Sequence, residues 1–174
     1  MRSKKGLLGY YNYTVILTYI GMLVAFFGIA LVLEGEYCKA VLCLMVAGAC
    51  DMFDGAVAST RPRMPKERRF GVQIDSLCDL ICFGVLPALM VYILNGRSGI
   101  ALVVCSLYVL CALIRLAYFN VLEEERQDKT RERRSCYLGL PVTTIALLLP
   151  ALFGLDRIRF IPVQVSSLVL LCVA

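Results

Sequence analysis

The chain has 174 residues, 60% of them hydrophobic, and a mean hydropathy of +0.78. A soluble domain is about 45–50% apolar, so this composition excludes an ordinary soluble protein and predicts an integral membrane protein. The net charge of +5 comes from lysines and arginines that gather in particular connections. We interpret that clustering as topology information, and we expect no nucleic-acid partner.

Runs of about 20 apolar residues cross the hydrocarbon core of a bilayer. The chain contains six candidate segments, which are Tyr13–Leu33, Ala40–Ser59, Phe70–Leu94, Ile100–Val121, Tyr137–Phe153 and 161–174. The last has only 14 residues, so we expect a short or truncated sixth helix. The prediction is an all-α integral membrane protein, with a single membrane domain over residues 1–174 and six transmembrane helices.

The positive charges predict the orientation of these helices. The N-terminus and the second and fourth connections hold 13 lysines and arginines, against four in the remaining connections. Cytoplasmic loops carry such an excess, so we expect these three regions to face the cytoplasm of a bacterium or archaeon. The start of the chain, MRSKKGLLGYYNY, is either a short interfacial helix on that surface or a tyrosine anchor for the first helix.

The second segment carries two carboxylates near its cytoplasmic end. Asp51, Asp54 and Ala58 are spaced i, i+3 and i+7, so they share one face of a helix. Gly55 lies beside them and leaves that face open to a ligand.

The third segment carries a matching pair of carboxylates. Gly71, Asp75 and Asp79 are spaced i, i+4 and i+8 and again share a face. We expect the two helices to be antiparallel neighbours that bring all four aspartates together at one depth. Further along, Pro87 removes a backbone donor, which frees the carbonyl near Phe83 and predicts a kink there.

Four clustered carboxylates in an apolar chain require compensation, because two charges about 4 Å apart repel by roughly 4 kcal/mol at an effective dielectric of 20. A structural alternative needs cationic partners, and the interior of the fourth segment offers Arg115 for that purpose. Oxygen ligands suit divalent cations. We therefore predict two Mg²⁺ or Mn²⁺ ions, with Ca²⁺ as the alternative, which would clamp a pyrophosphate.

The chain contains no histidine, so we expect a carboxylate to act as the general base. Asp79, the deeper residue of the second pair, is the candidate. The basic run from Arg61 to Arg69 either draws an anionic substrate to the site or serves as ordinary cytoplasmic anchoring.

Arg115 lies within the fourth segment, where a guanidinium must find an anion. It either pairs with one of the aspartates or grips a carboxylate or phosphate of a substrate in bidentate fashion. Other candidates for the same pocket are Tyr118, Asn120, Arg133 and Arg134.

The spaced motif Asp51-x-x-Asp54-Gly55-x-x-Ala58, followed by Gly71-x-x-x-Asp75-x-x-x-Asp79, resembles the signature of the CDP-alcohol phosphatidyltransferase family. The chain departs from that signature at Ser59, where the family has arginine, and Arg61 is the candidate replacement. Three further segments are similar to the phosphatidylserine synthase branch of the family, and the likeness extends from about Asn12 onward. These segments are Cys82-Phe83-Gly84-x-x-Pro87, Arg115–Val121 and Gly139-Leu140-Pro141.

The resemblance implies a homodimer of six-helix subunits in membrane lipid, with the active site facing the cytoplasm. It also implies transfer of a phosphatidyl group from CDP-diacylglycerol to the hydroxyl of L-serine, with release of CMP. By matched position, Asp79 would be the base and would also touch a metal. The other roles that it implies are metal binding by Asp51, Asp54 and Asp75 and CDP-diacylglycerol binding by Gly55, Ala58, Arg61 and Gly71.

Two alternatives remain open at the level of sequence. Another member of the family would use glycerol 3-phosphate or inositol phosphate as the acceptor, and would need more cations around the pocket. A cation transporter would also use intramembrane carboxylates, but it would favour acids spread along a path, whereas these lie on one side.

Overall fold

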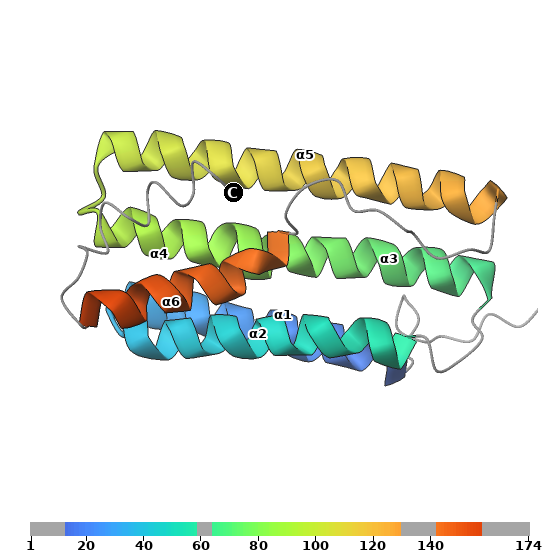
Figure 1. The fold of residues 1–174 in the computed structure, drawn as a ribbon, viewed down its shortest axis with the longest axis horizontal. Coiled ribbons are helices and arrows are strands. Elements are labelled where there is room, and N and C mark those ends of the chain that lie inside the picture. Colours follow the sequence, from blue (N-terminus) through green and yellow to red (C-terminus); the bar gives the residue numbers. More distant parts are fainter. Residues whose placement is uncertain (1–12, 59–63, 130–141, 158–174) are drawn as a thin grey trace, which may run out of the picture.

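The computed structural model describes residues 13–58, 64–129 and 142–157, and these residues are helical with no β-strand among them. Figure 1 shows the helices. They are α1 (Tyr13–Leu33), α2 (Tyr37–Ala58), α3 (Pro65–Asp79), the π-helix η1 (Leu80–Val85), α4 (Leu86–Leu94), α5 (Gly99–Lys129), the 3₁₀ turn η2 (Val142–Thr144) and α6 (Ile145–Arg157).

Four stretches are long and apolar enough to cross a membrane, which indicates an integral membrane protein. They match the first four predicted spans and are Val15–Leu33, Tyr37–Val57, Lys66–Leu94 and Gly99–Glu125. Of the fifth predicted span, Tyr137–Phe153, the structure describes residues 142–153, which form η2 and most of α6. The sixth span and the proposed interfacial segment lie outside the described residues.

Helix boundaries differ from the sequence-based prediction by several residues, most of all at the start of the third helix and the end of the fourth. The third helix begins at Pro65 rather than Phe70, because proline is well suited to the first turn, where its missing N–H costs nothing. Part of the basic run therefore lies on a helix. The fourth helix, α5, continues past Val121 to Lys129 through a charged stretch rich in strong helix formers.

Glycine-capped turns join consecutive helices at one end of the bundle. Gly35 has a φ of +83°, and the N–H of Glu36 donates to the carbonyl of Leu31 over 2.9 Å. Gly96, with a φ of +66°, ends α4 in the same way. These conformations suit glycine and satisfy the last carbonyls of each helix, and they make α1–α2 and α4–α5 tight helical hairpins.

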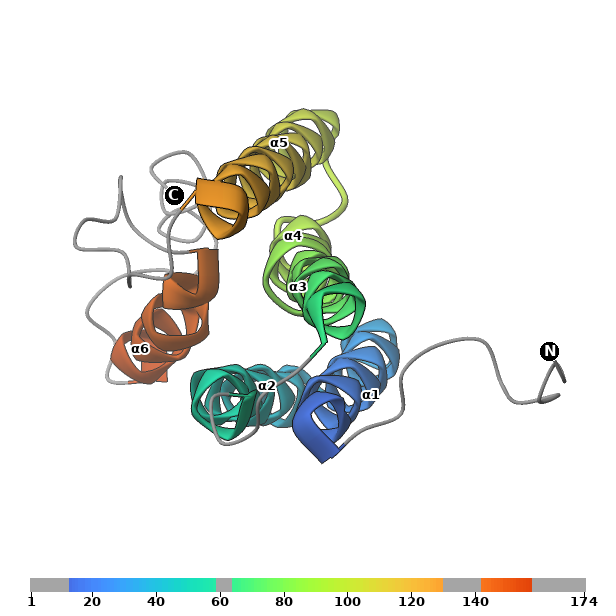
Figure 2. The ribbon, with the colours of Figure 1, turned by 90° about the vertical axis from the view of Figure 1, so that its right-hand side faces the viewer.

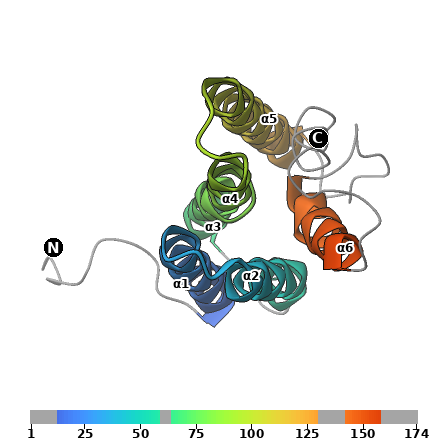
Figure 3. The ribbon, with the colours of Figure 1, turned by 90° about the vertical axis from the view of Figure 1, so that its left-hand side faces the viewer.

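The long helices lie side by side along one axis. Figure 2 looks from the end where α2 stops and α3 begins, and Figure 3 from the opposite end. α3, η1 and α4 follow one another as one long rod. α1 contacts α2 and this rod, and α5 contacts the rod from the side opposite α1. α6 packs against α2. This order places α2 and the whole length of α3, η1 and α4 against α1.

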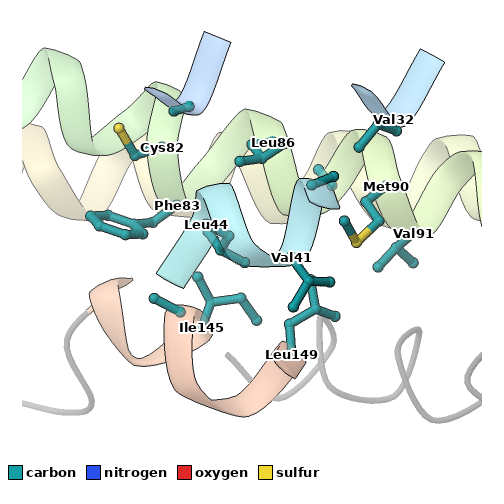
Figure 4. Close-up of a cluster of buried hydrophobic side chains, with 14 of the residues drawn as sticks. Val32, Val41, Leu44, Cys82, Phe83, Leu86, Met90, Val91, Ile145 and Leu149 are labelled. Atoms are coloured by element: carbon teal, nitrogen blue, oxygen red, sulfur yellow. The ribbon is translucent and has the colours of Figure 1, made fainter. Parts of the chain in front are cut away.

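The apolar core lies between α1, α2, η1, α4, α5 and α6, and Figure 4 shows its part around α2, η1, α4 and α6, with Val32 of α1. Leu44, Phe83 and Ile145 are fully buried there and come from three of these elements. Gly48 lets α2 and α6 approach closely, because a Cβ at that position would lie 2.8 Å from the Cβ of Ala146. Many large apolar side chains of α1 and α5 face outward, as expected of helices in lipid.

Where Pro87 was expected to kink the helix, the structure has the π-helix η1, which directly precedes α4. The carbonyl of Phe83 lacks a donor from Pro87, and the hydroxyl of Tyr108 on α5 donates to it over 2.7 Å. π-Helical segments are rare and frequently accompany functional sites. Here the segment begins immediately after Asp79.

Candidate active site

Three of the four predicted carboxylates converge in the structure. One oxygen from each of Asp51, Asp54 and Asp75 lies within 4.8 Å of the other two. Asp51 and Asp54 share a face of α2 near its end, and Asp75 lies on α3, which follows α2 in the chain. The i, i+3 spacing on one helix and the turn back into the next therefore produce the cluster expected from the sequence.

Asp79 lies beside this cluster, although it is not one of the three converging groups. Its carboxyl group is within hydrogen-bonding reach of Asp51, and the charges of Asp51, Asp54 and Asp75 all repel a negative charge on it. As the last residue of α3, Asp79 is one helical turn beyond Asp75. The site thus contains three convergent oxygens and a fourth carboxyl group next to Asp51.

A small pocket opens between α1, α2, α3 and η1 at this point. Three of the aspartates, Asp51, Asp54 and Asp79, are among its walls. The other lining residues are Thr18, Gly21, Ala47, Cys50, Cys78, Cys82 and Phe83. The pocket walls therefore combine carboxylates with small, thiol and aromatic groups.

Thr18 of α1 also belongs to the site, although no sequence pattern points to it. Its Oγ1 donates a hydrogen bond of 3.0 Å to Oδ2 of Asp54, and both residues are only 8% exposed. In sequence, Thr18 is one hydroxyl within an apolar run, where threonine often bonds to its own helix backbone. Its role becomes visible only through the contact between α1 and α2 in the folded structure.

The converging oxygens suit the divalent cation that the sequence predicts. The converging ligand atoms are carboxylate oxygens from half-buried or buried residues. Hard cations such as Mg²⁺, Mn²⁺ and Ca²⁺ prefer oxygen ligands of this kind. Asp51, Asp54 and Asp75 therefore fit such an ion.

The four residues expected at the nucleotide have different surroundings. Gly55 is exposed, and a Cβ built there meets no atom within 4 Å, so this part of α2 is open. Ala58 is the last residue of α2, and Gly71 is buried on α3. Arg61 lies outside the described residues, as does Ser59.

Of the residues expected at the acceptor, Arg115, Tyr118 and Asn120 lie on α5, and none of these three lines the small pocket. Arg115 is half-buried, with its guanidinium carbon 5.6 Å from the centre of the Phe119 ring. Tyr118 is 61% exposed. Asn120 accepts a 2.8 Å hydrogen bond from the hydroxyl of Ser76 on α3, which is adjacent to Asp75. Arg133 and Arg134 lie outside the described residues.

Comparison with known proteins points to one family. The family model for CDP-alcohol phosphatidyltransferase matches residues 11–173. A CDP-diacylglycerol–serine O-phosphatidyltransferase of Saccharomyces cerevisiae is 37% identical over 108 residues, covering 60% of this chain and 38% of the yeast protein. A protein of the same name from Helicobacter pylori is 31% identical over 143 residues, covering 80% of this chain and 54% of that protein.

An archaeal relative also matches. The archaetidylserine synthase of Methanothermobacter thermautotrophicus is 32% identical over 130 residues, covering 74% of this chain and 52% of that protein. The chain thus spans about half the length, or less, of these curated relatives.

Proposed function

We propose, since the chain belongs to the CDP-alcohol phosphatidyltransferase family, that it transfers a phosphatidyl group from CDP-diacylglycerol to L-serine. The observation that carries this proposal is the convergence of Asp51, Asp54 and Asp75 within 4.8 Å, with Asp79 beside them. The relatives support serine as the acceptor, because their names specify serine or archaetidylserine chemistry. The products would be phosphatidylserine and CMP.

In this proposal Asp51, Asp54 and Asp75 would hold two divalent cations, either Mg²⁺ or Mn²⁺, when substrate is bound. Asp79 would also be within reach of one of these ions. Bound cations would neutralise the pyrophosphate and stabilise the charge that develops on the departing CMP. The aspartates themselves fix where the pyrophosphate lies, at the end of α2 and against α3.

Asp79 acts as the general base. A serine hydroxyl placed beside its carboxylate gives up its proton to a carboxylate oxygen as the serine oxygen bonds to the phosphorus that carries diacylglycerol. The bond between that phosphorus and the oxygen bridging to CMP breaks, and the electron pair leaves with CMP. No histidine exists in the chain to perform this proton transfer.

The open surface at Gly55 would accommodate the nucleotide, together with Ala58, Gly71 and the predicted Arg61. The acyl chains would remain in lipid, against the outward-facing apolar side chains of the helices. Because the positive-inside pattern assigns the end of α2 to the cytoplasm, serine and CMP would enter and leave from that side. We also propose that this single membrane domain forms a homodimer.

The acceptor pocket is proposed on α5. Arg115 would bind the serine carboxylate through its planar guanidinium, with Tyr118, Asn120, Arg133 and Arg134 around it. The hydrogen bond from Ser76 to Asn120 supports this placement, because it connects α5 to the residue next to Asp75.

The acceptor is tested with purified protein in detergent, CDP-diacylglycerol and Mn²⁺ or Mg²⁺. We expect CMP release to depend on both the metal and L-serine, with phosphatidylserine as the lipid product. Parallel reactions with glycerol 3-phosphate and inositol phosphate serve as controls. Release of CMP with one of these acceptors, and not with serine, would overturn the serine assignment while leaving the family reaction intact.

A further inference from the structure

We propose that Thr18 is a positioning residue that orients the carboxylate of Asp54 for its divalent cation, an inference that rests on the proposed metal-assisted function. The contact is direct, since Oγ1 of Thr18 donates to Oδ2 of Asp54 over 3.0 Å. It joins α1, which carries none of the four aspartates, to the metal-binding face of α2.

The contact is buried at both ends, with each residue 8% exposed. A hydrogen bond shielded in this way is not exchanged readily for one to water, so it can hold one orientation of the carboxylate. A carboxylate accepts at about four lone-pair sites. The bond to Thr18 uses one of these sites, on Oδ2, and one oxygen of Asp54 also converges with oxygens of Asp51 and Asp75.

The helix packing explains why a side chain as short as threonine reaches Asp54. Gly21 follows Thr18 by three residues and faces the same side of α1. A Cβ at Gly21 would lie 3.3 Å from the Cβ of Cys50, which precedes Asp54 by four residues on α2. The glycine thus permits a close helix crossing one turn away from the hydrogen bond.

Residues that hold a metal ligand in place tune the affinity of the site, and their loss typically costs about 10–100-fold in metal affinity. Thr18→Val keeps the shape of the side chain and removes the donor. Thr18→Ser keeps the donor and removes a methyl group. The pair separates orientation of Asp54 from filling of space between α1 and α2.

The test is a titration of the full chain with Mn²⁺, in detergent and without substrate. The electron paramagnetic resonance signal of free Mn²⁺ reports how much of the ion is bound. We expect Thr18→Val to weaken binding about 10–100-fold and Thr18→Ser to restore it to near the wild-type level. Ser106→Ala is the matched control, because the exposed hydroxyl of Ser106 bonds to the carbonyl of Leu102 in its own helix. That variant should bind Mn²⁺ like the wild type.

Wild-type affinity in Thr18→Val, or an equal loss in Thr18→Ser, would overturn the role of Thr18. Thr18→Ala removes the same donor, so it replaces the valine variant if the latter does not fold. The acceptor assay on the wild type tests a different claim, the use of serine. If the wild type does not use serine but Thr18→Val still binds Mn²⁺ weakly, the serine assignment is overturned and the positioning role of Thr18 is retained.

Discussion

The hydroxyl of Tyr108 donates a 2.7 Å hydrogen bond to the backbone carbonyl of Phe83, and both residues are buried. Pro87 cannot donate to that carbonyl, so a residue from a neighbouring helix supplies the missing donor. The bond ties α5 to the π-helix that begins next to Asp79. The π-helical segment beside the candidate site is thereby tied to α5.

Removing this donor should destabilise the protein. In Tyr108→Phe, the Phe83 carbonyl is left buried without its partner, which costs about 1–3 kcal/mol. We expect a lower thermal unfolding midpoint in detergent. Tyr118→Phe is the control for loss of a phenolic hydroxyl, since that ring is 61% exposed on the same helix, and it should unfold like the wild type. Equal midpoints for all three proteins would contradict the proposed importance of the bond.

Asp79→Asn tests the general base. The amide has nearly the same shape as the carboxylate but cannot accept the serine proton, and general-base catalysis typically contributes about 10²–10⁴-fold in rate. Turnover should fall by that order while CDP-diacylglycerol still binds, as measured by displacement of a labelled CDP-lipid. A variant with wild-type turnover would remove Asp79 from the role of base.

Asp54→Ala tests the metal site. This change removes one of the three convergent ligand oxygens and the acceptor of the Thr18 hydrogen bond. We expect CDP-diacylglycerol binding to lose its dependence on Mn²⁺ or Mg²⁺. An unchanged metal titration in this variant would count against metal binding by Asp54.

Gly48 offers a test of the packing between α2 and α6. A Cβ at this position would meet the Cβ of Ala146 at 2.8 Å, so Gly48→Ala should strain the contact at a cost of about 1–3 kcal/mol. Adding Ala146→Gly removes the opposing carbon and should recover part of the loss. Thermal unfolding of the single and double variants checks this, and a double variant less stable than Gly48→Ala would show that the clash is not the cause.

Gly55, also on α2, differs from Gly48 because open space surrounds it. A Cβ there meets nothing within 4 Å, so a larger side chain should be tolerated by the fold. If the nucleotide approaches this surface, Gly55→Leu should raise the KM for CDP-diacylglycerol while the unfolding midpoint stays near that of the wild type. An unchanged KM would place the nucleotide elsewhere.

The convergence of the aspartates was predictable because helix geometry alone determines which side chains share a face. Asp51 and Asp54 on one helix, followed by Asp75 on the next, needed only an antiparallel return to meet. Local reasoning also pointed to an irregularity near Phe83, where the structure has the π-helix η1, since the missing N–H of Pro87 is a local property of the chain. The first four spans followed from the length and polarity of their apolar runs.

Other features depend on contacts that a linear pattern does not contain. Thr18 resembles any threonine in an apolar helix until α1 packs against α2 and brings it to Asp54. Asn120 appeared as a candidate for substrate binding, and its bond to Ser76 became visible only with α5 docked on α3. The donor that satisfies Phe83 is likewise 25 residues away in sequence.

The most direct measurement uses L-serine labelled with ¹⁸O in its side-chain hydroxyl, incubated with the purified protein, CDP-diacylglycerol and Mn²⁺. If the serine oxygen bonds to the phosphorus that carries diacylglycerol, mass spectrometry will find the label in the phosphate of phosphatidylserine and none in CMP. Unlabelled phosphatidylserine, or a serine ester of CMP carrying the label, would contradict the proposed reaction.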